Sequence, residues 1–283
     1  MKGIESRRAL GAALMIGLLT CFWSARTEAE EPRGATSSAV GAGAQANAAG
    51  LRLYDGFEGN TVAGFWLPGN YGSGLYVPGA IKLTTNYARS GRQAVQITVK
   101  EGNVDAAGDA GTRVERSELD SGHFNLLGEE AWYAFSVLVP KDFPIVDNRL
   151  VISSCKQSDV SRPLTAQRFR NGKHTLTVES QGRKREFRLP KLPLGKWVDF
   201  VCHARYSPSE DGLFELWMDG RRVASYTGPL ADPVNKNAFY HKIGLYRDRW
   251  KDPMTIYFDN YAMGNSYESV DPARFETNQK AAQ

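Results

Sequence analysis

Residues 239–264 read FYHKIGLYRDRWKDPMTIYFDNYAMG, and two strand-like segments there are joined by a short turn. Side chains alternate between the two faces of an extended segment. In the first segment Tyr240, Lys242, Gly244 and Tyr246 therefore share one polar and aromatic face. The opposite face carries His241, Ile243, Leu245 and Arg247. We predict that these neighbouring strands present a cation and a phenol side by side on a sheet, which suits the binding of an anionic sugar.

The rest of the chain shows the same short, alternating segments. The 283 residues are 42% hydrophobic and 11% aromatic, which is enough to build a sizeable core. Roughly a dozen strand-like segments follow one another at regular spacing, without a long amphipathic helix, and this predicts an antiparallel sandwich. Asn171-Gly172 and Asp219-Gly220 lie between such segments and predict tight hairpins.

The N-terminus has the features of an export signal, which we assign to residues 1–29. Lys2, Arg7 and Arg8 precede an apolar run over residues 9–23, which is too short for a membrane span. A twin-arginine motif and a lipoprotein box are weaker matches in the same region. These features predict a periplasmic or secreted protein without an integral membrane span in the mature chain.

Composition divides the remaining chain into three parts. Residues 30–50 are rich in Ala, Gly and Ser and predict a flexible linker, residues 51–265 form the folded domain, and residues 266–283 form a C-terminal tail. Loss of residues 1–29 would change the net charge from +4 to about +2. Such a mildly basic chain gives no support for nucleic-acid binding, although a local cationic groove is compatible with it. We expect a monomer.

Two cysteines remain outside the signal, Cys155 and Cys202. In an oxidising compartment they could pair, and the disulfide would stabilise the fold by on the order of 4 kcal/mol. Two buried free thiols on core strands are the equal alternative.

Residues 112–120, TRVERSELD, are the densest charged cluster in a strand-like context. Alternation places Arg116, Glu118 and Asp120 on one face and Glu115 on the other. A glutamate two residues from an arginine can hold its guanidinium in place to bind a carboxylate. The alternative is a solvated face with cross-strand ion pairs. Because Glu115 and Glu118 face apart, this strand offers no pair of glutamates for glycoside hydrolysis.

A lysine ends the apolar strand LVISSCKQS. Alternation predicts that Leu150, Ile152, Ser154 and Lys156 share one face. Desolvation there would lower the pKa of Lys156 toward that of a useful base. The alternative is a lysine at the exposed end of the strand that reaches into solvent.

His203 shares a predicted strand face with Trp197, Asp199, Val201 and Arg205. The four histidines are dispersed and form no metal-ligand pattern. The chain also contains no G-x-S-x-G nucleophile motif. His203 is therefore only a candidate for binding substrate.

Several motifs together resemble the heparin lyase I-like polysaccharide lyases, with wider similarity to alginate and glucuronan lyases. They are RSEL at 116–119, Tyr-x-Lys-x-Gly-x-Tyr at 240–246, and the run from GKWVDF through DGLFELWMDGRRV to YFDNYAMG. The resemblance covers most of residues 51–264. It implies a concanavalin-like β-jelly-roll sandwich whose concave sheet holds an anionic polysaccharide, and it agrees with export.

The resemblance also implies β-elimination at a uronic acid. Arg116 matches the arginine that neutralises the carboxylate, with Glu118 orienting it. Lys242 matches a substrate-binding lysine, and Tyr246 matches the tyrosine that protonates the leaving group and in some cases acts as base. Tyr240 and Ser154 complete the predicted substrate-binding set. No cofactor is required; related lyases often hold a structural calcium ion, but no dense Asp/Asn loop here calls for one.

One motif of the family is missing. Where the family commonly has Gln-x-His, this chain has Ser154 and Lys156. Either Lys156 is the base, or Tyr246 is both base and acid, or the groove binds polysaccharide without cleaving it. We predict an exported polysaccharide lyase; the alternatives are a non-catalytic carbohydrate-binding jelly roll and a glycoside hydrolase.

Overall fold

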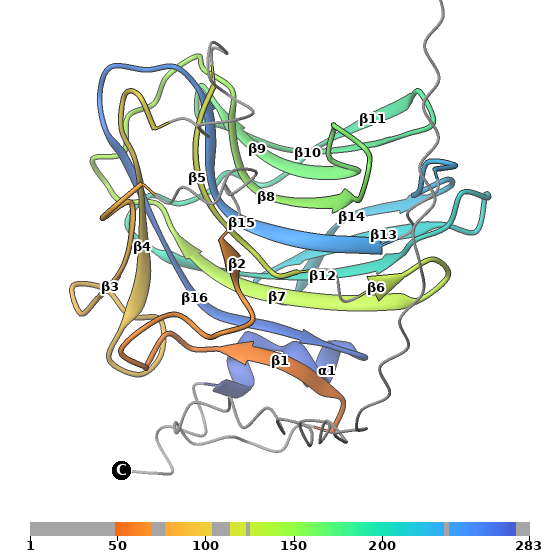
Figure 1. Ribbon diagram of the computed structural model, residues 1–283, viewed down its shortest axis with the longest axis horizontal. Coiled ribbons are helices and arrows are strands. Elements are labelled where there is room, and N and C mark those ends of the chain that lie inside the picture. The colour runs from red at the N-terminus through yellow and green to blue at the C-terminus, as the bar shows by residue number, and fades with distance from the viewer. Residues whose placement is uncertain (1–48, 69–76, 104–113, 123–124, 235–237, 276–283) are drawn as a thin grey trace, which may run out of the picture. The chain divides into compact units, whose positions relative to one another are not determined.

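The computed structural model describes residues 49–68, 77–103, 114–122, 125–234 and 238–275. They form two antiparallel sheets of eight strands each, sheet A and sheet B, with a short helix, α1 (Tyr267–Val270), beside sheet A (Figure 1). The predicted all-β jelly-roll sandwich is confirmed.

Sheet A has the strand order β14-β13-β12-β7-β16-β4-β3, and β1 pairs with β16. Its strands are β1 (Leu51–Asp55), β3 (Ile81–Thr84), β4 (Ala94–Val99), β7 (Glu130–Leu138), β12 (Trp197–Arg205), β13 (Leu213–Met218), β14 (Arg221–Thr227) and β16 (Met254–Gly264).

Sheet B has the strand order β11-β10-β9-β8-β15-β5-β2, and β6 pairs with β15. Its strands are β2 (Leu67–Pro68), β5 (Val114–Asp120), β6 (Asn125–Leu126), β8 (Leu150–Gln157), β9 (Thr165–Arg170), β10 (Lys173–Ser180), β11 (Arg183–Arg188) and β15 (Ala238–Asp248).

Tight turns connect several neighbouring strands. Asn171-Gly172 joins β9 to β10, and Asp219-Gly220 joins β13 to β14, as predicted, with positive φ at both residues of each turn. Gln181-Gly182 makes a third such turn between β10 and β11, which was not predicted. There the Gln181 side chain donates to Ala231 O at 2.9 Å, so a tertiary contact supports its unusual backbone.

The main hydrophobic core lies between the two sheets. Phe135 and Phe200 of sheet A and Phe239 and Leu245 of sheet B are among its fully buried members. Cys155 on β8 and Cys202 on β12 are buried in the same core and unpaired. The alternative of two buried free thiols is therefore the one that the structure shows.

A second, smaller cluster covers the outer face of sheet A. Val201 of β12 packs there with Val270 of α1 and with Phe275. The first residues of the segment predicted as a tail, 266–275, are thus packed against the sandwich. The predicted export signal lies outside the described residues, as does the linker up to residue 48. In the part of the chain that is described, no helix has both the length and the apolar character needed to cross a membrane.

A buried ion pair sets the register between β15 and β5. Arg247 lies opposite Glu115, their charged groups approach to 2.8 Å, and both side chains are fully buried. Arg247 also donates to the carbonyls of Trp250 and Asp252. The same register puts Tyr246 opposite Arg116 on the other face of sheet B.

The alternation predicted for β8 is wrong in its first half. Leu150 and Ile152 face the core, whereas Ser154 and Lys156 face outward. The pairing of β8 shifts by one residue between Val151 and Ser153 against β9. Such a bulge moves the following side chains to the other face of the sheet, and no local pattern announces it.

Gly244 is required by the packing of β15 on β5. Its φ is +144°, and an added Cβ would lie 2.4 Å from Ser117 O and 2.6 Å from the Cα of Glu118. The close approach of the neighbouring backbone of β5 therefore explains the glycine at this position.

Removal of one partner of the buried ion pair should cost far more stability than removal of both. Arg247→Met leaves the Glu115 carboxylate buried without its cation, so we expect a loss of about 3–5 kcal/mol in the free energy of unfolding. Urea denaturation followed by circular dichroism measures it. The double variant Glu115→Leu/Arg247→Met should regain part of this loss, and an Arg247→Met protein within 1 kcal/mol of wild type would contradict the role of the pair.

Candidate active site

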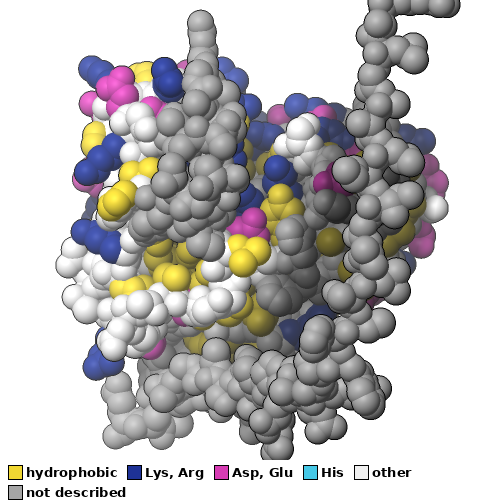
Figure 2. All heavy atoms as spheres, in the orientation of Figure 1, with side chains coloured by type: hydrophobic (Ala, Val, Ile, Leu, Met, Phe, Trp, Pro, Cys, Tyr) yellow, Lys and Arg dark blue, Asp and Glu magenta, His cyan; other side chains and the backbone are white. Residues whose placement is uncertain are grey.

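A groove of about 900 Å³ crosses the outer face of sheet B. Its lining comes from β5, β8, β9, β10, β11 and β15 and includes nine lysine and arginine side chains against four aspartates and glutamates. Lys and Arg side chains are frequent over the upper part of Figure 2, where these strands lie in Figure 1. The net charge of the whole chain is only +4, so the excess of Lys and Arg in this groove is a local concentration of positive charge. Such a concentration favours the binding of a polyanionic ligand.

Tyr246 lies between two arginines in this groove. The guanidinium carbons of Arg116 and Arg149 are each 5.0 Å from the centre of its ring. Arg116 comes from β5 and Arg149 precedes β8, so the strands on both sides of β15 supply a cation. Arg149 is held in place by Asp248, at 2.7 Å. An anionic group bound beside the Tyr246 phenol would thus meet two guanidinium groups.

Lys242 lies four residues before Tyr246 on the same face of β15, among carboxylates. Its Nζ is 3.7 Å from Glu118 and 3.8 Å from Asp120, and Glu118 also contacts Arg116 at 3.9 Å. Tyr240, two residues before Lys242, lies on the same face, and the Lys242 ammonium is 5.8 Å from its ring centre. Burial, and then the negative charges of Asp120 and Glu118, raise the pKa of the Tyr240 phenol. The predicted face of β15 is therefore present as expected.

Lys156 is half-buried in the groove wall. Burial, followed by the positive charge of Lys242, holds the pKa of Lys156 below its usual value. Its Nζ donates to Ser161 O at 3.3 Å. In the register of β8 and β15, Lys156 lies opposite Tyr240, and Tyr240 precedes Tyr246 by six residues. At about 3.3 Å per residue the backbone positions of Lys156 and Tyr246 are about 20 Å apart along the strands.

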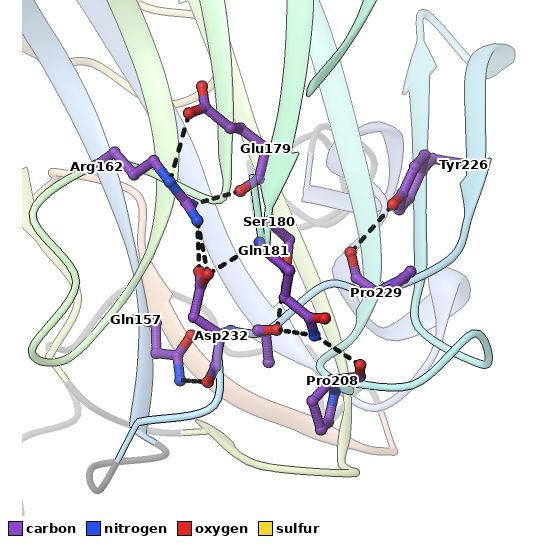
Figure 3. Close-up of polar contacts among 10 residues, drawn as sticks. Gln157, Arg162, Glu179, Ser180, Gln181, Pro208, Tyr226, Pro229 and Asp232 are labelled. Carbon is purple, nitrogen blue, oxygen red and sulfur yellow. Dashed lines mark hydrogen bonds and ion pairs between the residues drawn. The ribbon is translucent and has the colours of Figure 1, made fainter. Parts of the chain in front are cut away.

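The loop that receives Lys156 is fastened by a polar network (Figure 3). Arg162 makes two bonds of 2.7 Å to the Asp232 carboxylate and a third, also of 2.7 Å, to Glu179 O. Gln157 and Gln181 bind the same segment, since each contacts a backbone or carboxylate group of Asp232. This network ties β8, β10 and the chain before β15 together at one end of the groove.

Two further predicted residues lie in different places. Ser154 lines the groove, as predicted. His203 does not: it belongs to β12 of sheet A and contacts Glu130 and Glu215, at 3.0 and 3.3 Å, while stacking on Trp132. Alternation predicts which residues share a face with His203, but not the sheet to which its strand belongs. Because β12 belongs to sheet A, the assignment of His203 to the substrate groove is wrong.

No histidine lines the groove within the described residues. His241 lies on the central strand β15, but its ring turns into the core, where it bonds to Ser153 at 2.8 Å. Burial lowers the pKa of His241 to about 3, so it stays neutral. It therefore cannot replace the histidine of the missing Gln-x-His motif.

Four of the five arginines among the described groove residues were not identified from the sequence, and two of them, Arg149 and Arg168, are of interest here. Arg149 precedes its strand, and Arg168 stands in the middle of β9, separated from the known motifs. Alternation in LTAQRFR would have put Arg168 and Arg170 on one face, but nothing in the sequence relates β9 to Tyr246. No group of three or more His, Cys, Asp or Glu side chains that could hold a metal ion occurs in the described ranges. The calcium prediction stays untested.

The sequence matches the Polysaccharide lyase family over residues 51–262, and the chain belongs to this family. It is thus a polysaccharide lyase, an enzyme class that acts on anionic polysaccharides. No curated protein sequence matches the chain.

Solved structures share its fold. An endo-β-1,4-glucuronan lyase from the fungus Trichoderma reesei is 19% identical with a TM-score of 0.60, and the alignment covers 74% of this chain and 98% of that one. The alginate lyase A1-II′ of polysaccharide lyase family 7 is 16% identical with a TM-score of 0.51, covering 68% and 85%. A glycoside hydrolase family 131 catalytic domain from Coprinopsis cinerea is 14% identical with a TM-score of 0.53, covering 72% and 84%. At these identities the likeness shows the fold alone.

Proposed function

We propose that this protein cleaves a uronic-acid-containing polysaccharide by β-elimination in the groove of sheet B. The observation that carries the proposal is the Tyr246 phenol between Arg116 and Arg149. In β-elimination a base removes the C5 proton, a C4–C5 double bond forms as the C4–O bond breaks, and an acid protonates the leaving oxygen. Each of these steps has a candidate group at Tyr246.

The arginines would neutralise the carboxylate next to the acidic carbon. Negative charge develops on this carboxylate as the C5 proton leaves, and cations placed there beforehand stabilise it. Arg116 offers a planar fork for bidentate binding, and its contact with Glu118 at 3.9 Å orients it. Arg149 approaches the Tyr246 ring from the β8 side of β15, with its guanidinium carbon 5.0 Å from the ring centre. Lys242, steadied by Glu118 and Asp120, would bind a further part of the chain.

The register of the strands favours Tyr246 over Lys156 as the base. The backbones of Lys156 and Tyr246 lie about 20 Å apart along the strands, whereas the guanidinium groups of Arg116 and Arg149 lie directly beside the Tyr246 ring, so Tyr246 is the better placed base. Tyr246 as phenolate would take the C5 proton and then give it to the leaving oxygen, which regenerates the phenolate. Lys156 would bind a carboxylate elsewhere on the polymer.

We infer the substrate class from the family and the shared fold. Heparin lyase I-like specificity is one candidate, and the glucuronan and alginate lyases that share the fold suggest glucuronan or alginate as the polymer. The basic start and apolar run of residues 1–29 support export to the periplasm or the medium. We also propose that the enzyme acts as a monomer and needs no cofactor.

Product chemistry tests the reaction. The purified protein, incubated with polyglucuronate, alginate and heparin, should produce new ultraviolet absorbance from the unsaturated uronic acid with at least one of them. Reducing ends without this absorbance would identify a hydrolase instead. Retention on a polysaccharide with neither product would identify a binding protein.

Tyr246→Phe removes the phenolic proton but keeps the ring between the two arginines. Because Tyr246 would carry both proton transfers, kcat should fall about 100-fold or more. Binding of the polymer, measured by calorimetry, should change little. Retention of full turnover by this variant would rule out the assignment.

Substitutions of Lys156 distinguish a base from a binding cation. If Lys156 only binds an anionic group, Lys156→Arg should keep kcat within about tenfold of wild type, and Lys156→Ala should mainly raise KM. As a base, Lys156 would have to be neutral, so activity would rise with pH through its lowered pKa and Lys156→Arg would lose that rise together with nearly all turnover. The kcat profile of both variants against pH decides between the two roles.

A further inference from the structure

A row of side chains crosses the groove at right angles to the strands. Tyr246 on β15 lies opposite Arg116 on one side and Val151 on the other, and Val151 lies opposite Arg168 on β9. Residues opposite one another in antiparallel strands point to the same face. All four line the groove. At about 4.8 Å per strand, Arg168 stands about 10 Å from Tyr246 and about 14 Å from Arg116, so Tyr246 lies between the two arginines.

Arg168 differs from the other half-buried arginines of the groove in its partners. Arg116, Arg149 and Arg162 each have a carboxylate within ion-pair distance. Arg168 donates from Nε to Thr177 Oγ1 at 3.1 Å, and among the described residues its two Nη groups have neither a hydrogen bond nor an ion pair. A half-buried cation of this kind costs solvation energy that an anionic ligand would return.

The neighbours of Arg168 leave its two Nη groups on the groove side. Thr177 on β10 holds the Nε side, which leaves the two Nη groups to form a fork. Val151, the neighbour toward Tyr246, is apolar and 6% exposed, and would support the apolar face of a sugar ring. Burial, and then the positive charge of Arg149, lower the pKa of Arg168, and the negative charges of Glu179 and Glu186 offset this only in part.

We propose that Arg168 binds the carboxylate of a second uronic acid, on the opposite side of Tyr246 from Arg116. This rests on the proposed function, because it takes Tyr246 as the position of the bond that is cut. The substrate then carries uronic acids on both sides of that bond and crosses the strands from β5 toward β9. Arg168 is a specificity residue and takes no part in the proton transfers.

Binding in a Tyr246→Phe background tests this independently of turnover. The probe is a hexamer of glucuronic acid, and its Kd is measured by calorimetry. Arg168→Gln should weaken binding about tenfold or more, since a charge-assisted hydrogen-bond pair is lost. Arg168→Lys keeps the charge without the planar fork and should fall between the two.

Arg170→Gln is the matched control, because Arg170 is on the same strand and face but is already bonded to Asp147 at 2.8 Å. Its effect on Kd should be several-fold smaller than that of Arg168→Gln. Equal effects of the two substitutions, or no binding of the hexamer at all, would overturn the proposal. Thermal unfolding of each variant identifies any loss that comes from misfolding.

A sulfated polymer without uronic acids, such as dextran sulfate, separates carboxylate recognition from general attraction of anions. If Arg168→Gln weakens dextran sulfate binding as much as hexamer binding, the site recognises charge alone and the carboxylate assignment is wrong. The outcome is distinct from a failure of the proposed lyase reaction. A wild-type protein without unsaturated product, together with the Arg168 effect on binding, would refute only the reaction.

Discussion

The buried ion pair between Arg247 and Glu115 is the constraint on which the groove depends. These two residues lie opposite each other on the core side of β15 and β5, and the next position on the groove side is the pair of Tyr246 and Arg116. A slip of one residue would bring all side chains of β15 to the wrong face and leave a charge buried without its partner. The buried pair of Arg247 and Glu115 thereby determines that Arg116 lies beside Tyr246 on the groove side of the sheet.

The pairing of β8 contains a register shift on each of its two sides, against β15 and against β9. Gly244 lets the backbone of β15 come close to β5, and pairing with β8 shifts between Ile243 and Tyr246. On β8, Ile152 and Ser153 both turn toward the core, where Ser153 bonds to His241 at 2.8 Å. The strand thus returns Ser154 to the groove. One irregularity gives a buried imidazole a hydrogen-bond partner at its Nε2 and, at the same time, returns the next side chain to the face that lines the groove.

Sequence patterns predicted the parts of the site that depend on one strand. The alternation around Tyr246 holds because β15 pairs with β5 without a register shift from Lys242 to Asp248. Patterns failed where the answer depends on a neighbour: the face of Leu150 changes at a bulge, and His203 lies on the correct kind of face but in the other sheet. Arg168 was missed for the same reason, since only the pairing of three strands relates it to Tyr246. Alternation reports a face, whereas a site requires the strand order and register as well.

The same sandwich is shared with a glycoside hydrolase domain, so the charges in the groove must separate the two chemistries. Hydrolysis of a glycosidic bond needs a protonated carboxyl and a second, ionised one. Here Glu118 and Asp120 share one face of β5, and both are ion-paired with Lys242, at 3.7 and 3.8 Å. In the proposed elimination the proton for the leaving oxygen would come from Tyr246. Its two arginine neighbours would stabilise the negative charge that develops on a uronate carboxylate, which is the charge that an elimination creates and a hydrolysis does not.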